Sequence, residues 1–206
     1  MKTDAMSSLA ADFMLAVYLD GQGRVPSYFA GLDFGLSGAI LMELALDGFI
    51  QTADGYIVAV HAAGPRDRIL GEIHAEIRAS RRPRTASEWV RALSASAHRR
   101  LSAGLIADGV LVRTPRRLPS PTGSARRYDI RRGQRRHAAV RPAGAAADSF
   151  ARLAALAATA SACGAATDGR QRSEYEAESL FLSPACTEIL TAVADCVWLQ
   201  GLSSWT

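Results

Sequence analysis

The sequence predicts a mainly α-helical protein, a single domain with short β-hairpins. Apolar residues recur every three or four positions in several segments, which is the period of an amphipathic helix. Asp-Gly dipeptides precede or join short β-type runs, as in tight hairpins. The chain has 206 residues, 49% of them hydrophobic and 21% charged, which suffices for one well-packed core.

The first helix is expected over residues 7–19. Leu9, Phe13 and Val17 fall on one helical face, and Ser7 or Ser8 can cap the start by accepting backbone N–H groups. An aromatic-rich connection is expected to follow from Pro26 to Phe34.

The second helix is expected over residues 35–47, in the stretch GLSGAILMELALDG. It is apolar almost all round, so it should lie in the core. Glu43, its one carboxylate before the closing Asp47, is expected to be solvated or to cap a helix rather than to act in catalysis. Gly35 and Gly38 open this helix, where they would either approach a phosphate or allow close helix packing.

A β-hairpin and a third helix come next. The hairpin runs through residues 49–51 and 56–60, and Asp54-Gly55 supplies the positive φ angles of its turn. Residues 68–79 form the helix, in which Ile69, Ile73 and Ile77 are aligned. His74 lies beside that stripe and is expected at the boundary of the core.

A capping box then starts another helix. Thr85 and Glu88 can satisfy each other's backbone amides, and Trp89 begins the apolar face that follows. The segment HRRLSAGLIADGVLVRT (98–114) repeats the earlier order of helix, Asp-Gly and strand.

The chain changes character after this strand. Residues 113–141 contain ten arginines, and Asp129 is the only acid among them. We expect an exposed loop or a disordered insertion over about 113–145. Helices are expected again at 146–163 and at 185–199, the latter with Ile189, Val193, Val197 and Trp198 on its apolar face.

Several function classes find no support. There is no Gly-rich nucleotide loop, no GxSxG and no HExxH. The three cysteines and four histidines have no metal-ligand spacing. We therefore expect neither catalysis nor a cofactor or metal. The N-terminus does not resemble a signal peptide, and no stretch has the length of an apolar membrane span, which favours a cytoplasmic location.

The ordered motifs over residues 7–114 resemble the Golgi phosphoprotein 3 family, which includes many actinobacterial homologues. The most specific is Gly-Leu-x-Gly-x-x-Leu-x-Glu-Leu-Ala-Leu-x-Gly at 35–48, supported by its spacing to the Trp89 helix and to Asp108-Gly109. The resemblance implies one domain, here residues 7–206, with a central helical bundle and short hairpins at its edge. It implies a non-enzymatic adaptor, peripheral on the inner face of the membrane, whose eukaryotic relatives bind phosphatidylinositol 4-phosphate and help to retain glycosyltransferases.

The family's headgroup pocket is depleted here. Its tryptophan falls at Tyr28, its motif arginine at Ser37, and its later pair of arginines at Ala95 and His98, with Arg99 adjacent. Serine and alanine cannot replace the bidentate grip of arginine on phosphate. The candidate headgroup residues are thus Tyr28, Ser37, His98 and Arg99, and specific phosphoinositide binding is in doubt. The family's membrane-inserting hairpin corresponds to the arginine-rich stretch 113–141, which could contact anionic lipid.

A second hypothesis is a winged-helix nucleic-acid-binding protein that uses residues 98–141. The net charge of +4 and the pI of about 9.3 permit an anionic partner of either kind. Against it, the helix at 35–47 carries no basic residue, and the segment 98–107 has basic side chains only at its start. A protein partner is also compatible with the resemblance.

Overall fold

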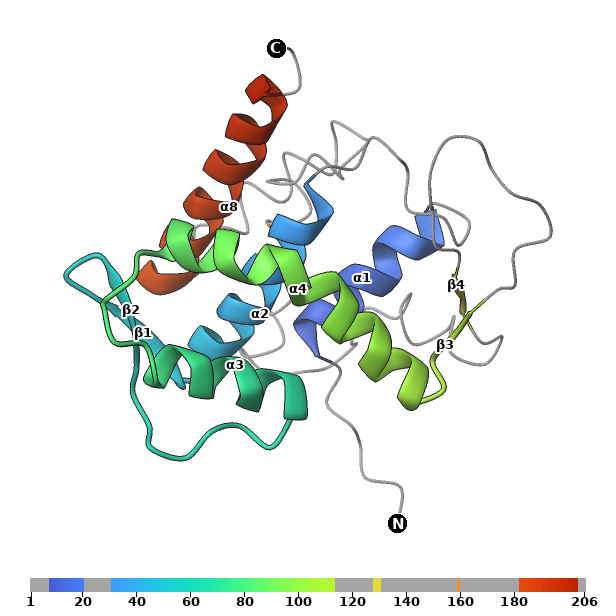
Figure 1. Ribbon diagram of the computed structural model, residues 1–206, viewed down its shortest axis with the longest axis horizontal. Helices are drawn as coiled ribbons and strands as arrows, with labels where there is room; N and C mark the ends of the chain where they lie inside the picture. The colour runs from blue at the N-terminus through green and yellow to red at the C-terminus, as the bar shows by residue number, and fades with distance from the viewer. Residues whose placement is uncertain (1–7, 21–30, 114–127, 131–158, 160–181, 204–206) are drawn as a thin grey trace.

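A computed structural model describes residues 8–20, 31–113, 128–130, 159 and 182–203. It confirms a mainly helical fold with short antiparallel hairpins at the edge (Figure 1). The described elements, in chain order, are α1 (Leu9–Asp20), α2 (Leu32–Leu46), β1 (Ile50–Ala53), β2 (Tyr56–Ala59), α3 (Arg68–Arg78), α4 (Ala86–Ala107), β3 (Leu111–Arg113), β4 (Tyr128–Ile130) and α8 (Pro184–Ser203).

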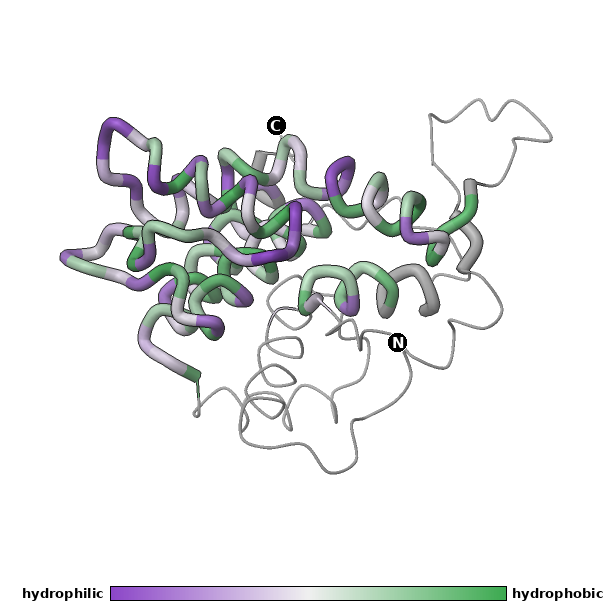
Figure 2. The backbone as a smooth tube through the Cα atoms, turned by 90° about the horizontal axis from the view of Figure 1, so that it is seen from below, coloured by the Kyte–Doolittle hydropathy of each residue, from purple (hydrophilic) through white to green (hydrophobic). Residues whose placement is uncertain are grey.

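Helix α2 forms the centre of the core, packing against α1, α4 and α8. Its residues are almost all apolar, so it can be covered on every side. Helices α3 and α4 mix charged and apolar residues, as expected when only one face is buried. Figure 2 shows hydrophilic and hydrophobic residues alternating along much of the described chain. The core therefore consists of α2 with the inward faces of its neighbours.

Two predictions about α2 were wrong. The helix begins at Leu32 rather than at residue 35, so Gly35 and Gly38 lie inside it and do not offer a helix terminus to a phosphate. A Cβ on Gly38 would come closer than 3.0 Å to the Val193 side chain, so this glycine serves close packing against α8. Glu43 is not solvated but 4% exposed, and its Oε2 accepts a hydrogen bond from Ser8 Oγ at 2.8 Å.

The first hairpin forms as predicted. Ile50 pairs with Ala59 and Ala53 with Tyr56, and both turn residues have positive φ, 52° at Asp54 and 78° at Gly55. A bridge between Ile57 and Arg84 joins β2 to the connection between α3 and α4.

Side-chain caps define the starts of α3 and α4. The Asp67 carboxylate accepts from the amides of Ile69 and Leu70, and Thr85 and Glu88 form the predicted capping box. Helix α4 continues without a break into the repeated segment at 98–107, so the repeat is one long helix followed by a strand. The Arg100 guanidinium lies 2.7 Å from the Glu76 carboxylate and links α4 to α3.

The arginine-rich stretch contains one unpredicted element. Residues 128–130 form strand β4, which pairs with β3 in the register Leu111–Ile130 and Arg113–Tyr128. A strand needs only a paired backbone partner, and the apolar pattern of three residues is too short to reveal it. Otherwise the predicted loop, and the helix at 146–163 apart from the buried Thr159, lie outside the described residues.

Helix α8 confirms the last predicted helix but corrects its apolar face. Ile189 and Val193 are fully buried, whereas Trp198 is 67% exposed. The tryptophan lies near the C-terminal end of the helix, where Leu199 is also exposed. None of the helices in the described ranges is long and apolar enough to cross a membrane.

Candidate functional site

The predicted headgroup residues divide between two packed helices. Ser37 lies on α2, and His98 and Arg99 lie on α4, which packs directly on α2. Tyr28 lies outside the described residues. Ser37 has no exposed surface, and its hydroxyl donates to the backbone carbonyl of Asp33 at 2.7 Å. Its hydroxyl hydrogen is therefore used within its own helix.

Asp33, in the first turn of α2, was not among the predicted site residues. Desolvation raises the pKa of the Asp33 carboxyl, while the charge of His98 lowers it. His98 and Asp33 are thus electrostatic neighbours across the α2–α4 contact. Asp33 precedes Ser37 by four positions, a spacing that puts both on one helical face and could have drawn attention to it.

This neighbourhood is poorly suited to grip a phosphate. An ionised carboxylate beside His98 offsets the attraction of an imidazolium for an anion. Ala95 is exposed but has no hydrogen-bond donor in its side chain. Arg100 forms an ion pair with Glu76. Arg99 is the exposed arginine next to His98. The geometry brings Ser37, Asp33 and His98 together, but it contains no pair of arginines aimed at one point among the described residues.

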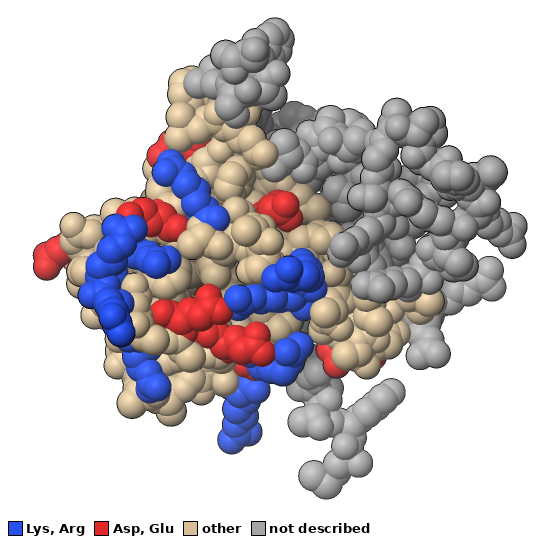
Figure 3. Space-filling view, in the orientation of Figure 1, with Lys and Arg blue, Asp and Glu red and all other residues tan. Residues whose placement is uncertain are grey.

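The charges on the described surface are mixed. Figure 3 shows basic and acidic side chains interspersed on the same face. The described residues contain ten arginines and fourteen aspartates and glutamates, a formal net charge of −4. Since the whole chain has a net charge of +4, its basic excess comes from residues outside the described ranges.

His74 is more deeply buried than predicted. It is 1% exposed rather than at a boundary, and its ring makes an edge contact with Phe49, with centroids 5.7 Å apart. Burial lowers the pKa of His74, and the charges of Arg78 and His61 lower it further. The described residues hold no group of three or more potential metal ligands.

Comparison with known proteins gives one family match. A model of the family Golgi phosphoprotein 3 (GPP34) matches residues 9–189. A comparison with curated proteins found no match. The matched range extends well past the motifs at 7–114 and includes the start of α8, whose Ile189 packs in the core. Because the match covers most of the chain, this protein belongs to the Golgi phosphoprotein 3 (GPP34) family.

Proposed function

We propose that this protein is a non-enzymatic, adaptor-like protein that associates with the surface of anionic membranes without selecting a phosphoinositide headgroup. Family membership supports the general role. The observation that carries the proposal is the separation of charge along the chain. The described residues have a net charge of −4, whereas residues 114–127 and 131–158 hold ten arginines and one carboxylate.

Part of this basic charge belongs to the segment 114–127, which follows strand β3 and precedes strand β4 in the chain. The two strands that flank this segment pair with each other, Leu111 with Ile130 and Arg113 with Tyr128. That segment contains Arg116, Arg117, Arg126 and Arg127. Each basic side chain near an anionic bilayer contributes about 1 kcal/mol, falling off within a Debye length.

The absence of headgroup selectivity follows from the α2–α4 contact. Selective recognition of a phosphate monoester needs several donors that converge on it, and paired arginines supply them best. Here Ser37 is buried and Asp33 adds a carboxylate beside His98. We therefore expect the surface charge of the membrane, rather than the identity of the lipid, to control binding.

Co-sedimentation with liposomes tests both the association with anionic membranes and the lack of headgroup selectivity. Three vesicle types are needed: neutral phosphatidylcholine, phosphatidylcholine with phosphatidylserine, and phosphatidylcholine with phosphatidylinositol 4-phosphate at the same surface charge. We expect binding to both anionic types, similar in strength, and its loss at high salt. Failure to bind anionic vesicles at low salt overturns the membrane role, and a clear preference for the phosphoinositide overturns the lack of selectivity.

Two variants that lose the same number of positive charges show which part of the chain contacts the membrane. Replacing Arg116, Arg117, Arg126 and Arg127 with serine removes up to about 4 kcal/mol of attraction before screening. The control replaces four exposed arginines of the described surface, Arg66, Arg68, Arg81 and Arg91, and changes the net charge equally. We expect the first variant to lose far more binding than the control, and equal losses would refute a contact through the segment 114–127.

The unmodified protein and these variants also distinguish membrane association from the alternative function, nucleic-acid binding. The exposed residues of α4 beyond Arg99 include Ala103 and Ala107, whose side chains cannot form hydrogen bonds with base edges. A gel shift with random duplex DNA that weakens steeply with salt, together with no vesicle binding, would favour that alternative.

A further inference from the structure

The connection between β2 and α3, residues 60–67, lies directly against helix α3. Figure 1 shows it running along the outer side of that helix. Two glycines allow the close approach. A Cβ on Gly71 of α3 would lie 3.1 Å from the Pro65 carbonyl oxygen. A Cβ on Gly64, within the connection, would lie 3.2 Å from His74 Nδ1.

Hydrogen bonds hold this connection at both ends and between them. The Val60 amide donates to the Phe49 carbonyl at 2.9 Å. At the other end, the Asp67 side chain caps α3. Between these points Arg78, in the last turn of α3, donates to the carbonyl of Ala62. The connection is therefore attached to α3 by a few contacts that could break without disturbing the core.

The side chain beneath this connection is a buried histidine. His74 is 1% exposed, and its Nε2 has no hydrogen-bond partner within the part of the chain that the structure describes. Gly64, which lies against Nδ1 of the same ring, is itself exposed. A single layer of chain thus separates the imidazole from solvent, and displacement of the connection is enough to hydrate the ring.

The surroundings of His74 oppose its protonation. Phe49 makes edge contacts with the rings of His74 and His61, with centroids 5.7 Å and 5.9 Å apart. Burial lowers the pKa of His74, the charges of Arg78 and His61 lower it further, and the backbone of Phe49 offsets this only in part. Helices α2 and α4 and strand β2 also pack on α3, but no charged group described in them shifts the pKa of His74. A buried imidazolium would therefore lie beside like charges.

We propose that the 60–67 connection is a pH-operated strap, which is closed over neutral His74 and opens when this histidine binds a proton. Opening hydrates the imidazolium and separates Arg78 from the Ala62 carbonyl. It also adds a cationic ring and more of Phe49 to the surface, so the protein presents a different surface in mildly acidic surroundings. The proposal does not depend on membrane association.

Proton linkage gives the size of the expected effect. The open form binds a proton more readily than the closed form, so the closed form loses stability as the pH falls. A hydrated imidazole has a pKa of about 6.5. For a closed form that stays neutral at pH 5.5, the equilibrium constant for opening rises by up to about tenfold between pH 7.5 and pH 5.5.

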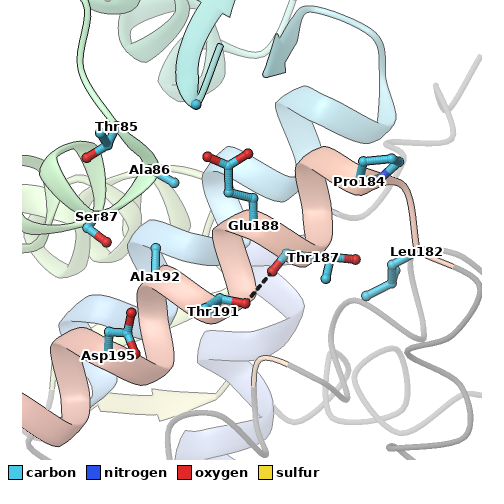
Figure 4. A pocket seen from close by; sticks show the side chains of 11 residues that line it. Thr85, Ala86, Ser87, Leu182, Pro184, Thr187, Glu188, Thr191, Ala192 and Asp195 are labelled. Carbon is cyan, nitrogen blue, oxygen red and sulfur yellow. Dashed lines mark hydrogen bonds between the residues drawn. The ribbon is translucent and has the colours of Figure 1, made fainter. Parts of the chain in front are cut away.

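Amide hydrogen exchange in the unmodified protein, measured by NMR spectroscopy at these two pH values and corrected for the intrinsic rate, tests the proposal. The reporters are the amides of Val60, Ile69 and Leu70, which bond at the two ends of the strap. The Thr187 amide of α8 is the reference. Thr187 lines a separate cleft between α8 and the start of α4 (Figure 4), and no described residue of α3 or of the strap lines that cleft.

We expect protection of the reporters to fall by up to about tenfold at pH 5.5, with little change at Thr187. A fall of less than about twofold at the reporters overturns the proposal. An equal fall at Thr187 also overturns it, because global unfolding rather than local opening would then be the cause.

Substitutions assign the response to one histidine. His74→Gln has no titratable group beneath the strap and should show the same protection at both pH values. His61→Gln is the matched control, because His61 is exposed and contacts the same Phe49 ring, and it should keep most of the response. If His74→Gln does not fold, NMR titration of the unmodified protein decides, since opening must follow protonation of His74 and not of His61. The proposal fails if His74→Gln keeps the full response or if His61→Gln abolishes it.

Discussion

Replacing Gly38 with alanine tests the central helix contact of the fold. A new Cβ would lie closer than 3.0 Å to Val193 Cγ2, 3.7 Å from Val193 Cβ and 3.9 Å from Ile189 Cγ2. Val193 and Ile189 have no exposed surface, and a β-branched valine has little freedom at χ1. The methyl group therefore cannot be accommodated by a simple rotation.

The expected change in the free energy of unfolding of Gly38→Ala is the difference between two effects. Alanine inside a helix is favoured over glycine by about 1 kcal/mol, whereas overpacking of a dense core costs about 1–3 kcal/mol. Because the contact involves a buried, branched side chain, the cost should be near the upper end. We expect a net loss of about 2 kcal/mol in the free energy of unfolding, or roughly 4–8 °C in melting temperature for a chain of this size.

Urea denaturation followed by far-ultraviolet circular dichroism measures this loss. Gly104→Ala is the matched control, because its Cβ would meet only the flexible end of Ile69, at 3.1 Å, and should be nearly neutral or slightly stabilising. Val193→Ala in the Gly38→Ala background should recover part of the stability, giving a favourable coupling of about 0.5–3 kcal/mol. If Gly38→Ala is as stable as the unmodified protein, or if the two substitutions show no coupling, α2 and α8 do not pack as described.

Three further predictions concern other buried or capping groups. Burial lowers the pKa of His74 below 6.5, so the unfolded chain binds more protons than the native one and stability should fall as the pH drops below 6.5. The melting temperature of His74→Leu should depend less on pH across this range, and an unchanged profile would contradict the role of His74. Thr85→Ala removes half of the capping box of α4 and should cost about 1 kcal/mol, measured by urea denaturation; Ser94→Ala, within the same helix, is its control. Ser8→Ala removes a donor to the buried Glu43 carboxyl and should cost about 1–3 kcal/mol, and an effect no larger than that of Ser96→Ala would show that this hydrogen bond does not stabilise the α1–α2 contact.

Local patterns were enough to predict most of the described elements. The capping box at Thr85 and Glu88, the Asp54-Gly55 turn and the spacing of Ile69, Ile73 and Ile77 act over a few residues. Such features depend on backbone geometry and helical period, which a single sequence displays directly. The family, too, could be inferred from the order and spacing of motifs, and the family match confirms it.

The candidate site was only partly accessible in this way. The candidate residues were transferred from the family pattern. In the structure, Ser37 bonds to the backbone of Asp33, and the Asp33 carboxyl lies close enough to His98 on α4 to feel its charge. The burial of Ser37 and the presence of Asp33 could not be predicted, because both depend on which face of α2 meets α4. Whether these residues contact a lipid stays a prediction.

The sequence by itself determined the helical class, the hairpins, the caps and the family. The tertiary structure decided what Gly38, Glu43 and Trp198 do: the first allows α2 to approach α8, the second is buried against Ser8, and the third is exposed. The physical reason is that exposure and pairing depend on contacts between residues far apart in the chain, whereas helical period, turn geometry and capping are properties of neighbouring residues.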